Sequence, residues 1–136
     1  MKEMTVEARG ENVRVLTDWA DAELERLECP LKAQMQIDLA IDEIFTNIAS
    51  YAYAPGTGSA TVTMDYDAES GMFSLTFCDS GVPYNPLQKE DPDVNLPAEE
   101  RSIGGLGIFL VKKTMYDMRY EYRDGQNILT LMKKIS

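Results

Sequence analysis

Three short groups of residues in this chain have the types and spacing to do chemistry together. In the first, Glu43 and Asn47 are four residues apart, so a helix places them on one face, together with Ala40 and Tyr51. A glutamate can accept a proton or orient an attacking group, and an asparagine oxygen can take a Mg²⁺ coordination position. Solvated helix faces commonly carry the same residue types, so this pair indicates a catalytic site only together with other groups.

The second group is Asp79-Ser-Gly81, which follows an apolar strand pattern directly. A carboxylate at a strand end can point inward and accept a hydrogen bond from an exocyclic amine. Gly81 has no Cβ to block a flat ring from stacking near the backbone. Because Asp-Ser-Gly is also a common turn, this signal alone is only moderate.

The third group, Gly104-Gly105-Leu106-Gly107, stands at the predicted start of a helix. Successive amides in a glycine-rich turn, together with the positive end of a helix, form an anion site suited to phosphates. The group has neither the ending of a P-loop nor the G-x-G-x-x-G spacing. Each glycine costs a helix about 1 kcal/mol relative to alanine, which favours a binding role.

Hydrophobic periodicity and turn residues predict the elements that must position these groups. The predicted elements, in chain order, are a strand over 4–9, helices over 13–29 and 31–53, strands over 60–67 and 72–79, a helix over 104–118, and strands over 119–123 and 127–135. Asn12 is the expected N-cap of the first helix, and Asp124-Gly125 is a strong hairpin turn signal. The order predicts an α+β two-layer sandwich with one mostly antiparallel sheet covered by helices.

The segment from Ser80 to Ile103 has no regular pattern and includes an acidic, proline-bearing middle. A loop this long in a small domain is usually functional. We therefore expect Gln88–Ile103 to form a mobile lid over the site.

Length and composition restrict the class of protein. The 136 residues suit a single domain, 1–136, and the 13 basic and 23 acidic side chains give a net charge of −10. This acidity argues against a surface that binds nucleic acid, and no apolar run approaches the ~20 residues of a membrane helix. The absence of histidine excludes histidine bases and histidine metal sites, and Cys29 and Cys78 are too far apart for a CxxC site. We expect a soluble, cytoplasmic protein.

In this order, the three groups resemble the N, G1 and G2 boxes of the Bergerat-fold ATPases, the superfamily of gyrase and the histidine kinases. Within it, they are similar to the anti-sigma-factor serine kinases of bacterial sporulation and stress switches. The matching segments are Ala40-x-x-Glu43-x-x-x-Asn47-x-x-x-Tyr51-Ala52-Tyr53, Asp79-Ser-Gly-Val-Pro-Tyr-Asn-Pro86 and Gly104-Gly-Leu-Gly-Ile-Phe-Leu110. The resemblance spans about residues 13–135. One departure is Tyr51, where many relatives have histidine.

The resemblance implies that ATP and Mg²⁺ are the cofactors, and it assigns roles by position. Glu43 would be the general base or polarising carboxylate for γ-phosphate transfer, and Asn47 the Mg²⁺ ligand. Asp79 would accept a hydrogen bond from the adenine amino group, Gly81 would give the ring its space, and Thr130 would make a contact at the adenine end. The phosphate turn would be Gly104, Gly105, Leu106 and Gly107, and Arg101 would contact phosphate and partner.

By resemblance, the protein would be an ATP-dependent serine/threonine kinase that binds a sigma factor and phosphorylates a STAS-type antagonist on serine. Relatives often form homodimers. An alternative is a module that binds ATP and sequesters its partner without phosphoryl transfer. The catalytic domain of a histidine kinase fits less well, because the chain has no histidine-bearing dimerisation segment and Pro83–Pro86 replaces that group's second glycine.

Overall fold

The computed structural model describes residues 1–88 and 105–136. The elements, in chain order, are β1 (Lys2–Glu7), α1 (Val13–Arg26), α2 (Leu31–Asn47), β2 (Ser59–Asp67), β3 (Met72–Asp79), α3 (Gly105–Thr114), β4 (Asp117–Arg123) and β5 (Gln126–Lys134), with short helical turns η1 (Gly10–Asn12), η2 (Ile48–Ala52) and η3 (Pro86–Gln88). The predicted lid, Gln88–Ile103, lies outside the described residues except for Gln88, as do Arg101 and Gly104 of the predicted site.

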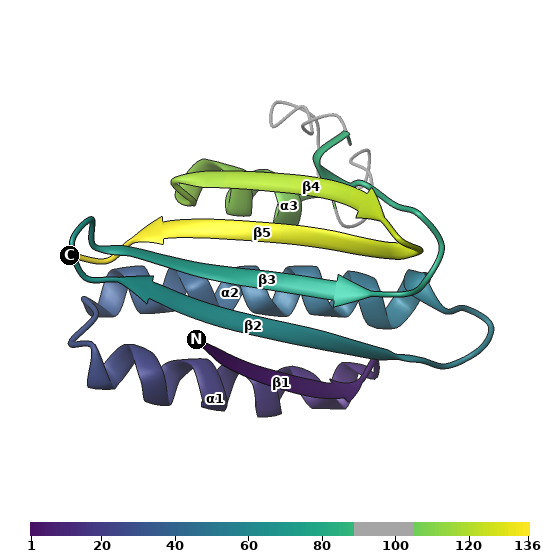
Figure 1. Ribbon diagram of the computed structural model, residues 1–136, viewed down its shortest axis with the longest axis horizontal. Helices are drawn as coiled ribbons and strands as arrows, with labels where there is room; N and C mark the ends of the chain where they lie inside the picture. Colours follow the sequence, from purple (N-terminus) through teal and green to yellow (C-terminus); the bar gives the residue numbers. More distant parts are fainter. Residues whose placement is uncertain (89–104) are drawn as a thin grey trace.

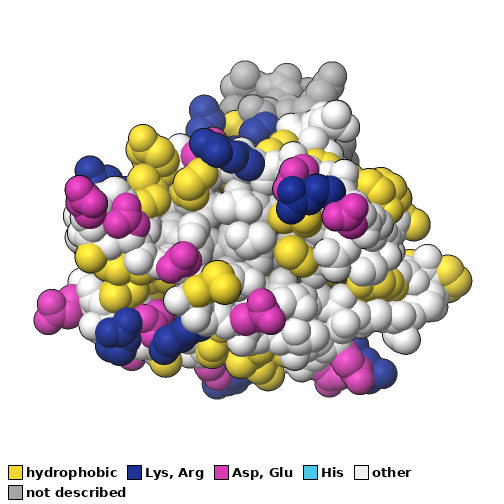
Figure 2. Space-filling model, viewed as in Figure 1, with side chains coloured by type: hydrophobic (Ala, Val, Ile, Leu, Met, Phe, Trp, Pro, Cys, Tyr) yellow, Lys and Arg dark blue, Asp and Glu magenta, His cyan; other side chains and the backbone are white. Residues whose placement is uncertain are grey.

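The described strands form one antiparallel sheet in the order β1-β2-β3-β5-β4, so β3 is central and β1 and β4 are the edges. Helices α1, α2 and α3 cover one face of this sheet (Figure 1). The other face is uncovered, and its middle carries neutral side chains with charged ones around them (Figure 2). The predicted α+β two-layer sandwich is thereby confirmed.

The core lies between the sheet and the helices, because alternate residues of the strands point toward the helical layer. The largest fully buried side chains are Phe45, Phe73, Phe77, Leu16, Leu24, Ile37, Ile41, Val62 and Val111. Helix α2 contacts both α1 and α3, and its core face follows the predicted helical spacing. Since α2 and β3 are both anchored in this core, their ends are fixed relative to each other.

The β4–β5 hairpin forms as the Asp124-Gly125 pair predicts. Both residues have positive φ, 54° and 76°, and Arg123 pairs with Gln126 across the turn. Glycine adopts this conformation without strain, and aspartate tolerates it better than most residues. The turn therefore sets the register of β4 on β5.

Several helix ends differ from the predictions. Helix α1 ends at Arg26 rather than at residue 29, and α3 ends at Thr114 rather than at residue 118, because β4 already begins at Asp117. Asn12 stands at the N-cap position of α1 as predicted, but its side chain makes no capping hydrogen bond, and its amide donates to the Glu7 carbonyl (2.9 Å). Helix α2 ends at Asn47 and continues as the π-helical turn Ile48–Ala52, whereas periodicity alone predicted one helix to Tyr53. Within the described part of the chain, no helix is both long and apolar enough to span a membrane.

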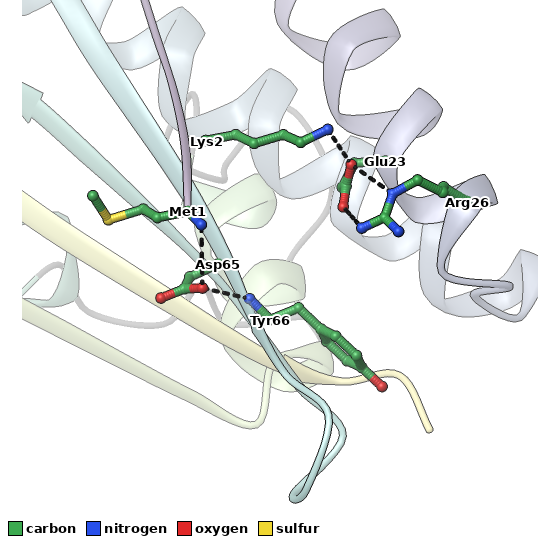
Figure 3. A network of polar contacts seen from close by, with 6 residues as sticks. All are labelled: Met1, Lys2, Glu23, Arg26, Asp65 and Tyr66. Carbon is green, nitrogen blue, oxygen red and sulfur yellow. Dashed lines mark hydrogen bonds and ion pairs between the residues drawn. The ribbon is translucent and has the colours of Figure 1, made fainter.

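A buried carboxylate ties the edge strand β1 to α1 (Figure 3). Glu23 accepts hydrogen bonds from Lys2 Nζ (2.6 Å) and from the Arg26 guanidinium through both nitrogens of its fork. These hydrogen bonds, from Arg26 first and from Lys2 second, lower the pKa of Glu23 to about 2. The ionised form of Glu23 is therefore part of the folded state.

Candidate functional site

A cavity opens where β3 and β5 meet the end of α2. Its lining residues are Ile44, Asn47, Ile48, Tyr51, Ala52, Phe77, Asp79, Val82, Tyr84, Pro86, Tyr120, Asn127 and Leu129. The lining is mostly apolar and aromatic, with three polar side chains, Asn47, Asp79 and Asn127. A small-molecule site typically has this mixture of an apolar wall with a few polar groups.

Asp79 is the buried acidic side chain of this cavity, with only 6% of its surface exposed. Its Oδ1 accepts hydrogen bonds from the Gly81 amide (2.9 Å) and from Asn127 Nδ2 (2.9 Å). Its Oδ2 has no hydrogen-bond partner in residues 1–88 and 105–136. Because this oxygen is not used by the described residues and Asp79 lines the cavity, Oδ2 is suited to accept a hydrogen bond from a ligand.

Asn127 holds Asp79 and the chain that follows it. Besides Asp79, its Nδ2 donates to the Val82 carbonyl (2.9 Å), and its Oδ1 accepts from the Tyr84 amide (3.0 Å) and from the Tyr120 hydroxyl. Burial raises the pKa of Tyr120, which keeps that hydroxyl protonated as a donor. Since both its donors and its acceptor are used within the protein, Asn127 positions Asp79 rather than binding a ligand itself.

Gly81 is needed for a close approach between the loop after β3 and η2. A Cβ at this position would overlap the Ala52 carbonyl, and the Val82 amide donates to that same carbonyl (2.9 Å). The physical reason differs from the predicted one, because the space beside Gly81 is filled by protein backbone. A π-helical turn such as η2 often marks a functional site, and here it presents the Ala52 carbonyl to the loop.

The structure brings the first predicted group next to the third. Asn47 lines the cavity, and its side chain makes no hydrogen bond to the described residues. Glu43, one helical turn earlier, is half-buried against α3, where a Cβ on Gly107 would overlap the Glu43 carboxylate. Gly107 is thus the residue that lets Glu43 approach α3. Gly105 and Leu106 form the backbone of the first turn of α3.

Comparison with known proteins identifies the family. The model of the histidine kinase-like ATPase domain matches residues 6–133. The chain belongs to this family. The serine/threonine-protein kinase BtrW of Bordetella bronchiseptica is 31% identical over 100 residues, which are 74% of this chain and 70% of BtrW. The serine-protein kinase RsbW of Bacillus mycoides is 26% identical over 131 residues, which are 93% of this chain and 81% of RsbW.

Solved structures of histidine kinases share the fold of this ATPase domain. The histidine kinase domain of the blue-light activated kinase from Erythrobacter litoralis EL346 superposes with a TM-score of 0.50 at 16% identity, covering 78% of this chain and 46% of that chain. The histidine kinase AdeS of Acinetobacter baumannii superposes with a TM-score of 0.51 at 12% identity, covering all of this chain and 70% of AdeS. At these identities the likeness concerns the fold alone.

Thr130 of this ATPase domain lies elsewhere than predicted. Strand β5 alternates, so Asn127, Leu129 and Leu131 face the helices, whereas Thr130 faces the uncovered side of the sheet. Its hydroxyl pairs with the Thr76 hydroxyl (3.2 Å) on the neighbouring strand. The residue of β5 that lies beside Asp79 is Asn127, three residues earlier.

The cavity fits the nucleotide that the ATPase family implies. Asp79 Oδ2 is an acceptor of the kind that an adenine amino group needs, and apolar side chains surround it. For Mg²⁺, no group of three or more metal-binding side chains occurs among the described residues. Because Mg²⁺ usually takes one or two protein oxygens and completes its shell with phosphates and water, the Asn47 oxygen would suffice as a protein ligand.

Proposed function

We propose that this ATPase domain is a serine/threonine protein kinase and anti-sigma factor, which binds a sigma factor and phosphorylates a STAS-type anti-sigma-factor antagonist on serine. The observation that carries the proposal is Asp79 Oδ2, which has no partner among the described residues and belongs to a side chain that lines the cavity. Asn47 of α2 lines the same cavity, and Glu43 lies one turn earlier on that helix. The relatives BtrW and RsbW, named as serine kinases, support the choice of reaction. This function places the protein in the cytoplasm, where transcription takes place.

The base of ATP would occupy the apolar cavity, with its amino group donating to Asp79 Oδ2. The phosphates would then extend along α2 past Asn47 toward Glu43 and the first turn of α3, whose amides form an anion site together with the helix dipole. Arg101 would contact the phosphates and the partner protein. The Asn47 oxygen would hold Mg²⁺, which would supply positive charge beside the phosphates.

In the transfer step, the serine oxygen of the antagonist forms a bond to the γ-phosphorus, and the bond from that phosphorus to the β–γ bridging oxygen breaks. ADP leaves with the bridging oxygen, and the serine proton passes to the Glu43 carboxylate. A positioned general base of this kind contributes typically 10²- to 10⁴-fold to a rate. Gly107 serves the step indirectly, because any larger residue there would displace the Glu43 carboxylate.

A module that binds ATP without phosphoryl transfer is the alternative. The observation that favours it is the position of Glu43, whose carboxylate lies against α3 and does not line the cavity. In that arrangement Glu43 would join α2 to α3 as a structural group. ATP would then stabilise the partner-binding form of the protein.

A transfer assay separates these two functions. The full chain is incubated with Mg-ATP labelled at the γ-phosphate and with purified STAS-domain proteins encoded near its gene, and label on serine is measured. Transfer that is lost in Glu43→Gln but kept in a matched variant on the outer face of α2, Asp42→Asn, supports the kinase. Nucleotide binding by calorimetry with no transfer to any of these proteins favours the sequestering module.

A further inference from the structure

The ladder between β2 and β3 ends in an unusual way beside the cavity. Ala60 and Asp79 are its last paired residues, so Ser59 and Ser80 would form the next pair. Instead, the Ser80 amide donates to Tyr53 Oη (2.7 Å), and the Tyr53 hydroxyl donates to the Ser59 carbonyl (2.6 Å). The phenol hydroxyl therefore stands between two backbone groups that would otherwise meet directly.

The surroundings of Tyr53 hold its ring in this place. A Cβ on Gly58 would overlap the ring, so only glycine lets the chain before β2 pass beside it. Tyr53 also follows Ala52 directly, and the Ala52 carbonyl accepts the Val82 amide. Consecutive residues at the end of η2 thus bind the loop after β3 on both sides of Gly81.

Each amide that follows Asp79 consequently has a fixed acceptor. The Ser80 amide is bound by Tyr53, the Gly81 amide by Asp79 itself, and the Val82 amide by Ala52. Two of these three acceptors come from the segment that extends α2. The same helix carries Asn47, so these contacts set where Asp79 lies relative to the opposite wall of the cavity.

We infer that Tyr53 is a positioning residue of the nucleotide site, whose hydroxyl separates the ends of β2 and β3 and thereby directs Asp79 Oδ2 toward the adenine amino group. This inference rests on the proposed binding of ATP. Without the hydroxyl, the Ser80 amide either loses its acceptor or moves to the Ser59 carbonyl. Gly81 has no spare room against Ala52, so either change shifts the loop and the carboxylate.

The test uses Tyr53→Phe, with Tyr66→Phe as the matched control. Tyr66 lies on β2, and its hydroxyl forms a hydrogen bond with Ser136 Oγ (3.0 Å). It pairs with Phe73, toward the opposite end of the β2–β3 ladder from Asp79. Affinities of the full chain for ATP and for inosine triphosphate, which lacks the amino group, are measured by competition with a fluorescent nucleotide. Amide hydrogen exchange at Ser80 and Val82 is followed by NMR.

We expect Tyr53→Phe to weaken ATP binding about tenfold, to weaken inosine triphosphate binding less, and to speed exchange at Ser80. Tyr66→Phe should leave all three measurements unchanged. In Tyr53→Phe, the affinity for ATP divided by that for inosine triphosphate should therefore fall. A variant that is merely less stable would bind both nucleotides more weakly to the same extent, so this ratio would not change. If the wild type binds ATP and Tyr53→Phe binds it equally well, or if the ratio is unchanged, the role of Tyr53 is wrong. If the wild type binds no ATP, the proposed function fails first, and this role in nucleotide binding fails with it.

Discussion

Asn127 Nδ2 lies 2.9 Å from Asp79 Oδ1, across the pairing of β5 with β3. This contact joins the buried carboxylate of the cavity to a side chain 48 residues later in the chain. It leaves one carboxylate oxygen of Asp79 for a ligand and uses the other within the protein.

Asn127→Ala should weaken both the fold and nucleotide binding. The substitution leaves the Val82 carbonyl and the Tyr84 amide without their partner and removes one of the two donors to Asp79 Oδ1, which costs about 2–3 kcal/mol in free energy of unfolding. Thr130→Val is the matched control on the same strand, because Thr130 faces the uncovered side of the sheet. Urea unfolding and ATP calorimetry on both variants check this; equal ATP affinity in a folded Asn127→Ala protein would contradict it.

Glu43→Gln and Gly107→Ala should separate binding from chemistry. Glu43→Gln keeps the shape but removes the proton acceptor, so ATP should still bind while phosphoryl transfer falls about 10²-fold or more. Gly107→Ala should have a similar effect, because the added methyl group overlaps the Glu43 carboxylate. Gly10→Ala is the control, since nothing lies near a Cβ at that position. Transfer at the wild-type rate in Glu43→Gln would show that the base is another group.

The Glu23 network should make stability fall in acid. The pKa of Glu23 is about 2 in the folded chain against 4.5 ordinarily, so its stabilisation is present above pH 4.5 and is lost as the pH falls toward 2. Glu23→Gln should cost about 1–2 kcal/mol at pH 7, since the exposed partners Lys2 and Arg26 are partly screened. Asp65→Asn, whose ion pair with the Met1 amine spans 3.9 Å between exposed groups, should change little. Unfolding curves at pH 3 and pH 7 measure the difference.

The contact between Asp21 and Asp38 should make stability fall as the pH rises, which is opposite to the effect of Glu23. Asp21 on α1 and Asp38 on α2 each have one oxygen hidden from water without a hydrogen-bond partner. The pKa of Asp38 is raised to about 8. Burial is the largest cause, and the hydrogen bond with Asp21 and the charge of Asp21 come next. The folded state then binds more protons than the unfolded state between about pH 4 and pH 8, so stability should decline as the pH rises through this range. Melting temperatures of Asp38→Asn should lack this decline, whereas Asp42→Asn, on the exposed face, should keep it.

The sequence predicted those site residues whose position depends on a single helix or strand. Helical periodicity placed Glu43 and Asn47 on one face, and the apolar strand before Asp79 placed that carboxylate at a strand end. Asn127 and Tyr53 were missed because their roles depend on contacts between distant segments. The pairing of β3 with β5 is not between consecutive strands, so no turn sets its register in the way that Asp124-Gly125 sets β4 on β5. The only signals in the sequence are an asparagine near the start of the last strand and a Tyr-Ala-Tyr run at the end of the second predicted helix.

The most direct test of the central claim is calorimetry of nucleotide binding to Asp79→Asn. The amide presents a donor where the adenine amino group needs an acceptor, and losing one hydrogen bond to a charged group costs about 1.5–3 kcal/mol. We therefore predict that ATP and ADP both bind about 10- to 150-fold more weakly, while the melting temperature without nucleotide stays close to that of the wild type. Unchanged ATP affinity in a folded Asp79→Asn protein would contradict the assignment of this cavity as the adenine site.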